Sequence, residues 1–159
     1  MKKIDLGQTI SLLANIGVLV GIVFVGFELR QSNRIAVGTT SYELSRNWLA
    51  INDLILTNPE VRNLLVELRD EDFQPDNDQH EELANAYARR QLSNWIAIQE
   101  AYDNGLVSKE LYDVALSEVS YIVAFRPGVV GQYDEFPPAW LNYELMQPIR
   151  TALEDRRSP

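Results

Sequence analysis

The chain has 159 residues and a net charge of −9, which leaves room for an apolar anchor and one compact domain of roughly a hundred residues. It contains no cysteine, and this excludes disulfides, thiolate metal sites and thiol nucleophiles. Residues 1–34 carry four basic and two acidic side chains, so residues 35–159 carry a net charge of −11. A domain this acidic is repelled by phosphate backbones, and we do not expect it to bind nucleic acid.

The first predicted element is an apolar helix from Ile10 to Phe27, with the sequence ISLLANIGVLVGIVFVGF. Its length and lack of charge are typical of a single membrane span. It is longer than the apolar stretch of a cleaved signal peptide, and the nearest small-residue segment resembling a cleavage site, residues 36–38, lies too far downstream. Basic residues flank both ends, so the positive-inside rule leaves the orientation open, and we favour a cytoplasmic C-terminal domain.

Bulky and small residues sort onto opposite halves of this helix when each residue is stepped by about 100°. Every Leu and Phe falls on one half, and every Gly, Ala, Ser and Asn falls on the other. Gly17 and Gly21 form a GxxxG pair, which lets a second helix approach closely in lipid. Chance is the alternative, because glycine is common in membrane helices. The predicted helix-packing interface consists of Ser11, Ala14, Asn15, Gly17, Gly21 and Gly26.

Beyond the span the sequence predicts an all-α fold, since no stretch alternates as a strand does. The transmembrane helix is expected to continue into a small bundle of about four to five helices. The domain boundaries follow: a membrane anchor over 1–29 (span about 10–27), a juxtamembrane helix over 30–57, a helical bundle packed on it over 58–155, and a tail over 156–159.

Caps and helix breakers set the expected boundaries within this bundle. A first helix runs to about Leu56 with Gly38 as its weak point, and a second is capped by Asn58 with Pro59 at its first position. After a polar loop over 69–78, a helix runs from near Gln79 to Tyr102 and is stopped by Asn104 and Gly105. The next helix is capped by Ser108 and ends at Arg126, and a last helix begins near Pro138 and is kinked or split by Pro148.

Two segments resemble a known type of protein. The junction Glu28–Ala36 (ELRQSNRIA) and the helix-stop-helix segment Ala101–Glu110 (AYDNGLVSKE) are similar to those of an uncharacterised family of small bacterial single-span proteins. Members of this family have a Gln/Arg/Asn-rich juxtamembrane helix and a C-terminal helical domain. The resemblance implies attachment to the bacterial inner membrane and a helical domain, and it implies no activity.

Candidate polar sites have simpler structural explanations. His80 is the single histidine and lies among Asp78, Glu81 and Glu82, where we expect a solvated helix start rather than a metal or acid–base site. The acidic stretch over 70–78 lacks the EF-hand spacing, so we expect a solvated loop rather than a calcium site.

Arg89 and Arg90 are adjacent within a helix, so one of them is expected to point inward. We interpret the two as a possible structural ion pair site, with Glu43, Glu67 or Glu118 as the carboxylate partner. The aromatic tail is expected to serve as core and cover, with a partner groove as the alternative. Its rings are Tyr133, Phe136, Trp140 and Tyr143.

The sequence contains no P-loop, nucleophile elbow, HExxH or dinucleotide fingerprint. We therefore expect a non-enzymatic, single-pass scaffold or accessory subunit without cofactor or metal, partnered by the lipid bilayer and by itself or another membrane protein. A homo-oligomeric pore with Ser11 and Asn15 along a polar path is one alternative. A membrane-tethered enzyme is the other.

Overall fold

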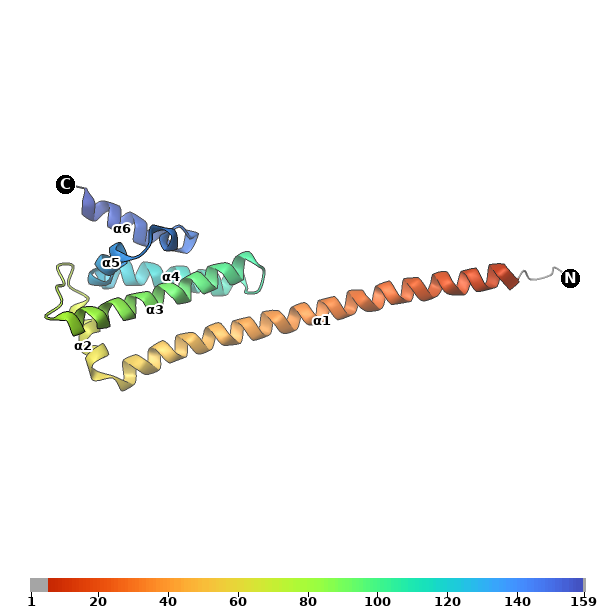
Figure 1. The fold of residues 1–159 in the computed structure, drawn as a ribbon, viewed down its shortest axis with the longest axis horizontal. Helices are drawn as coiled ribbons and strands as arrows, with labels where there is room; N and C mark the ends of the chain where they lie inside the picture. Colours follow the sequence, from red (N-terminus) through yellow and green to blue (C-terminus); the bar gives the residue numbers. More distant parts are fainter. Residues whose placement is uncertain (1–5, 159) are drawn as a thin grey trace. The chain divides into compact units, whose positions relative to one another are not determined.

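The computed structural model describes residues 6–158, and every regular element in that part of the chain is helical (Figure 1). The predicted all-α class is confirmed. The chain divides into two compact units, Met1–Thr39 and Thr40–Pro159. The elements are α1 (Leu6–Thr57), α2 (Pro59–Glu67), α3 (Asp78–Asp103), α4 (Lys109–Phe125), α5 (Pro127–Gln132), the 3-10 turns η1 (Tyr133–Glu135), η2 (Pro138–Leu141) and η3 (Glu144–Met146), and α6 (Gln147–Arg157).

Helix α1 continues without a break through the first unit and into the second, as the sequence predicts. Gly38 does not interrupt it, because one glycine costs only about 1 kcal/mol relative to alanine in a helix. Within residues 6–158, α1 is the one helix that is long and apolar enough by itself to be a candidate membrane span, and its apolar window is not buried inside the chain. Lys2 and Lys3 lie outside the described residues.

Local capping explains where the next helices begin and end. The Asn58 side chain accepts hydrogen bonds from the backbone N–H groups of Glu60 and Val61, and Pro59 occupies the first turn of α2. Ser108 caps α4 as predicted. After α3 the chain reverses at Gly105, whose φ of +68° is a backbone conformation that favours glycine.

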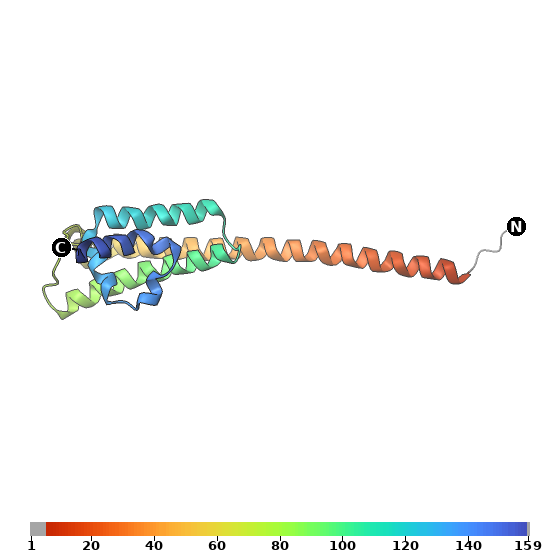
Figure 2. The same cartoon turned by 90° about the horizontal axis from the view of Figure 1, so that it is seen from above.

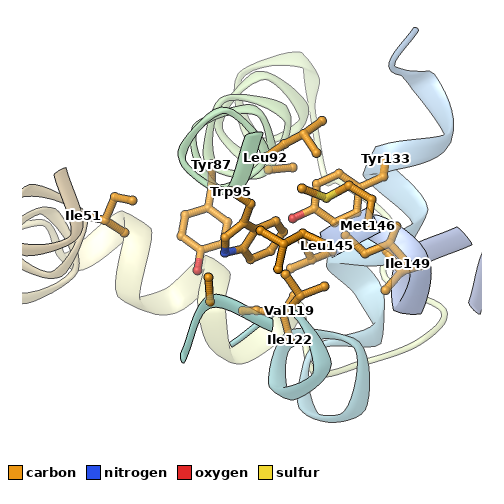
Figure 3. Packing of buried hydrophobic residues seen from close by; sticks show 14 of the residues in the cluster. Ile51, Tyr87, Leu92, Trp95, Val119, Ile122, Tyr133, Leu145, Met146 and Ile149 are labelled. Carbon is orange, nitrogen blue, oxygen red and sulfur yellow. The ribbon is translucent and has the colours of Figure 1, made fainter. Parts of the chain in front are cut away.

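The core of the second unit forms around Trp95, which is fully buried on α3 (Figure 3). Val119 and Ile122 of α4 lie on one side of its ring, and Tyr133 and Leu145 lie on another. Helix α4 packs against α3 and also against α5 and α6 (Figure 2). The last turns of α1 contribute Leu44 and Ile51 to the same core, with Trp48 partly buried beside them.

The C-terminal segment corrects the prediction of one last helix from near Pro138. The chain instead forms the short turns η2 and η3, and α6 begins only at Gln147. Pro148 neither kinks nor splits a helix, because it lies in the first turn of α6, where its missing N–H is not needed. Helix α5 was not predicted, and Pro127 starts it in the same way.

Candidate functional site

A cavity of about 550 Å³ lies between the last turns of α1, the start of α2 and the middle of α3. All of its walls belong to the second unit. Apolar side chains form most of the wall, and none of the lining residues is acidic, although the chain has 23 Asp and Glu residues. The lining residues are Asn47, Ile51, Leu54, Val61, Leu83, Ala86, Tyr87, Arg89, Arg90, Ser93 and Asn94.

Asn94 is the unusual member of this wall. Its side chain is 5% exposed, and neither its amide nitrogen nor its amide oxygen has a hydrogen-bond partner among the described residues. A buried polar group without a partner costs about 1–3 kcal/mol, so native proteins rarely keep one. Each of these two atoms exposes less than 1 Å², so Asn94 holds an unused donor and an unused acceptor just beneath the cavity wall.

Arg89 and Arg90 border the same cavity, and the structure corrects the prediction that one of them points inward. Both side chains are exposed, and neither takes part in an ion pair within residues 6–158. The Arg89 guanidinium lies over the ring of Phe136, 5.7 Å from its centroid. Arg90 has neither an ion pair nor an aromatic ring over it among the described residues, so its charge is available to a ligand at the cavity.

Two of the carboxylates expected to pair with these arginines have other partners. Glu118 accepts hydrogen bonds from the indole nitrogens of Trp48 and Trp95. Glu67 pairs with His80, with 3.1 Å between Oε2 and Nε2. Glu43 is exposed on α1. An inward arginine was predicted because adjacent helix positions face different ways, but both arginines are exposed, and the residues that this turn of α3 buries are Ala88 and Gln91.

A polar cluster lies behind the cavity wall at Tyr87. The Tyr87 hydroxyl accepts hydrogen bonds from Gln91 Nε2 at 3.0 Å and from Arg126 Nη1 at 3.1 Å. Burial raises the pKa of Tyr87 above its ordinary value of 10.0, while the hydrogen bond from Gln91 acts in the opposite direction. Tyr87 is therefore a neutral, fixed part of the wall near neutral pH.

His80 is more enclosed than the sequence predicted. Its side chain is 16% exposed, its ring meets Phe73 edge-on at 5.5 Å, and its Nδ1 accepts the backbone N–H of Asp76. The nearby acidic stretch forms a turn in which Asp70 Oδ1 accepts the backbone N–H of Asp72. Among the described residues, no three His, Asp or Glu side chains are grouped as metal ligands.

The residues of the predicted helix-packing interface all lie on the exposed surface of α1. A Cβ added at Gly17, Gly21 or Gly26 would meet nothing within 4 Å. The small size of these glycines is therefore not required by any contact in the part of the chain that the structure describes. In the aromatic tail, Tyr133 and Phe136 are buried, and Trp140 and Tyr143 pack partly buried against the core, as expected.

The sequence interpretation missed the cavity and the state of Asn94. One signal was present, because Arg90 and Asn94 are four residues apart on one face of a helix whose two preceding turns carry Leu83 and Tyr87. No protein-family model, curated protein or solved structure matches this chain significantly. The resemblance to a bacterial single-span family stays a prediction.

Proposed function

We propose that this protein is a single-pass membrane scaffold or accessory subunit that assembles through one half of its N-terminal helix. The observation that carries the proposal is the open space around Gly17, Gly21 and Gly26, where an added Cβ would meet nothing within 4 Å among residues 6–158. Glycine in a helix interior costs about 0.8–1.0 kcal/mol relative to alanine. Three glycines on an otherwise well-formed helix are best explained by a neighbouring helix that needs the space.

The lipid environment makes such a neighbour favourable. Inside a bilayer, helices associate through close packing and interhelical hydrogen bonds, for which small residues are suited. Asn15 lies on the same half as Gly17 and Gly21, and its exposed amide would be costly against lipid tails. Leu and Phe occupy the other half, which suits contact with lipid.

We further propose that the anchor lies in a bacterial inner membrane with the helical domain in the cytoplasm. The uncharged length of residues 10–27 supports a span, and the resemblance at residues 28–36 supports the bacterial setting. Alkaline phosphatase fused to the C-terminus reports the side, since this enzyme is active only in the periplasm. An inactive fusion is expected, and an active one would reverse the orientation.

Cross-linking tests the assembly directly, because the chain has no cysteine of its own. Single cysteines at Gly21 and at Val23 lie on opposite halves of α1 and are both exposed. Oxidation in native membranes should give a disulfide-linked dimer at Gly21 and little at Val23. Equal dimer at both positions would contradict a defined contact half, and no dimer at Gly21 would exclude self-association and leave another membrane protein as the partner.

A further inference from the structure

We infer that the cavity between α1, α2 and α3 binds a single-chain carboxylate of the fatty-acid type. Its volume of about 550 Å³ falls in the range of small-molecule sites, roughly 300–1,000 Å³. Such sites combine an apolar wall with a few polar groups that fix one end of the ligand. The cavity has both parts.

The apolar part suits a hydrocarbon chain. Ile51 and Val61 are buried in the wall, and Leu54 and Leu83 are partly buried beside them. These four side chains come from three helices, so they surround the space rather than form one flat stripe. Moving a hydrocarbon chain from water into this space is favourable in proportion to the apolar surface that it buries.

The polar part suits an anionic head. Arg90 borders the cavity, is exposed and has no ion pair within residues 6–158. A guanidinium binds a carboxylate through charge-assisted hydrogen bonds in a fork geometry that matches both oxygens. The absence of acidic residues from the lining removes the local repulsion that such a head would otherwise meet.

The unpartnered amide of Asn94 gives the head a second group in the wall. Asn94 lies one helical turn after Arg90 on α3, so the two side chains are neighbours in the cavity lining. The terminal torsion of an asparagine is broad, and a rotation about it brings the amide N–H toward a bound oxygen. Binding would then supply the hydrogen bond that this buried group lacks.

The charge of the domain selects a singly charged head over a phosphate. Residues 35–159 carry a net charge of −11, which repels anions at longer range in proportion to their charge. Arg89 keeps its charge, but its guanidinium lies over the Phe136 ring, so Arg90 supplies the guanidinium that can pair with a head group, and one guanidinium pairs with one carboxylate. A monocarboxylate therefore fits better than a phosphate dianion, and the proposal is independent of how α1 assembles in the membrane.

Octanoate tests the proposal, since it is soluble and short. The full-length protein is placed in phosphatidylcholine nanodiscs, and octanoate is titrated by calorimetry with protein-free nanodiscs as the blank. Binding is expected, and octanol, which has the same tail and no charge, should bind at least tenfold more weakly, as loss of a charge-assisted hydrogen bond predicts. Absence of octanoate binding, or equal binding of octanol, would overturn the proposal.

Matched variants locate the head group. Arg90→Gln should weaken octanoate by roughly tenfold and leave octanol unchanged. Arg69→Gln removes the same charge from an exposed position outside the cavity lining and should change neither. Asn94→Leu replaces the unpartnered amide with an apolar side chain, so it should fold and still weaken octanoate. Equal affinities for Arg90→Gln and Arg69→Gln would show that the head binds elsewhere.

Competition with an anionic phospholipid distinguishes a free carboxylate from a phospholipid headgroup as the ligand of this cavity. Nanodiscs containing an anionic phospholipid, phosphatidylglycerol, should leave octanoate affinity at the cavity unchanged apart from the general repulsion at the membrane surface, which also affects Arg69→Gln. If phosphatidylglycerol weakens octanoate binding to the wild type but not to Arg90→Gln, the lipid competes at Arg90. This result would assign the site to a phospholipid headgroup and contradict the carboxylate.

Discussion

The indole nitrogens of Trp48 and Trp95 donate to the same carboxylate oxygen, Oε2 of Glu118, at 2.8 and 2.9 Å. Trp48 belongs to α1, Trp95 to α3 and Glu118 to α4, so one carboxylate joins three helices. Trp95 is fully buried, whereas Glu118 is partly exposed. A carboxylate has lone pairs for both donors and keeps contact with water, which limits the cost of its charge.

Replacing this acceptor should destabilise the domain. Glu118→Leu leaves the buried indole N–H of Trp95 without a partner, and we expect a loss of about 2–3 kcal/mol in the free energy of unfolding. Glu118→Gln retains a neutral acceptor and should lose about 1 kcal/mol. Denaturation of the full-length chain in nonionic detergent, followed by tryptophan fluorescence, measures both. Glu82→Leu, at an exposed position, is the control, and an equal loss there would refute the special role of Glu118.

Gly128 is a second position at which a substitution should destabilise the domain. A Cβ at this residue would lie 2.5 Å from the backbone oxygen of Asp70 and 2.9 Å from the Cβ of Phe73. Backbone atoms cannot move aside cheaply, so Gly128→Ala should cost about 1–3 kcal/mol. Gly38→Ala is the matched control, because a Cβ there meets nothing within 4 Å and alanine favours the helix. A Gly128→Ala protein as stable as wild type in the same denaturation assay would contradict the contact.

The helices were predictable where local chemistry decides their ends. Asn58 and Ser108 cap through bonds to residues two or three positions away, and Gly105 reverses the chain through its own backbone conformation. The tail was not predictable in this way. Arg150 donates to the backbone oxygens of Leu141 and Tyr143, and this tertiary contact helps hold the turns that replace the expected helix.

The residues of the candidate sites were also predictable only where local sequence decides their environment. The exposure of Gly17 and Gly21 follows from one helix and could be anticipated from its pattern. The environments of Arg90 and Asn94 depend on which side chains α1 and α2 bring to α3. Periodicity places residues on a face, but it does not say whether a facing helix fills the space or leaves a cavity.

Gln99 gives a prediction about a buried polar contact. Its Oε1 accepts the backbone N–H of Leu145 at 3.0 Å and the hydroxyl of Tyr112 at 3.2 Å, and its Nε2 donates to Asp103. Gln99→Leu leaves a buried backbone donor unpaired, so we expect a loss of about 1–3 kcal/mol. Hydrogen exchange should show faster exchange at the Leu145 amide. Unchanged exchange there would show that Gln99 does not hold this turn.

Tyr133 predicts how stability depends on alkaline pH. Its side chain is fully buried, its hydroxyl has no hydrogen-bond partner among the described residues, and burial raises its pKa well above the ordinary value of 10.0. The folded state therefore holds this proton more tightly than the unfolded chain does. The stability linked to it is complete below about pH 10 and is lost as the pH rises from there toward the folded pKa.

Tyr133→Phe removes both the titrating proton and the unpartnered hydroxyl while keeping the ring that packs against Trp95 and Phe136. At pH 7 the variant should be as stable as wild type or more stable by up to about 1 kcal/mol, because no buried hydroxyl is left unpaired. Above pH 10 it should lose less stability than wild type over the same interval. Denaturation midpoints at pH 7, 10 and 11 measure both effects. A parallel alkaline loss in the two proteins would show that other groups, such as Tyr87, account for it, because burial raises the pKa of Tyr87 too.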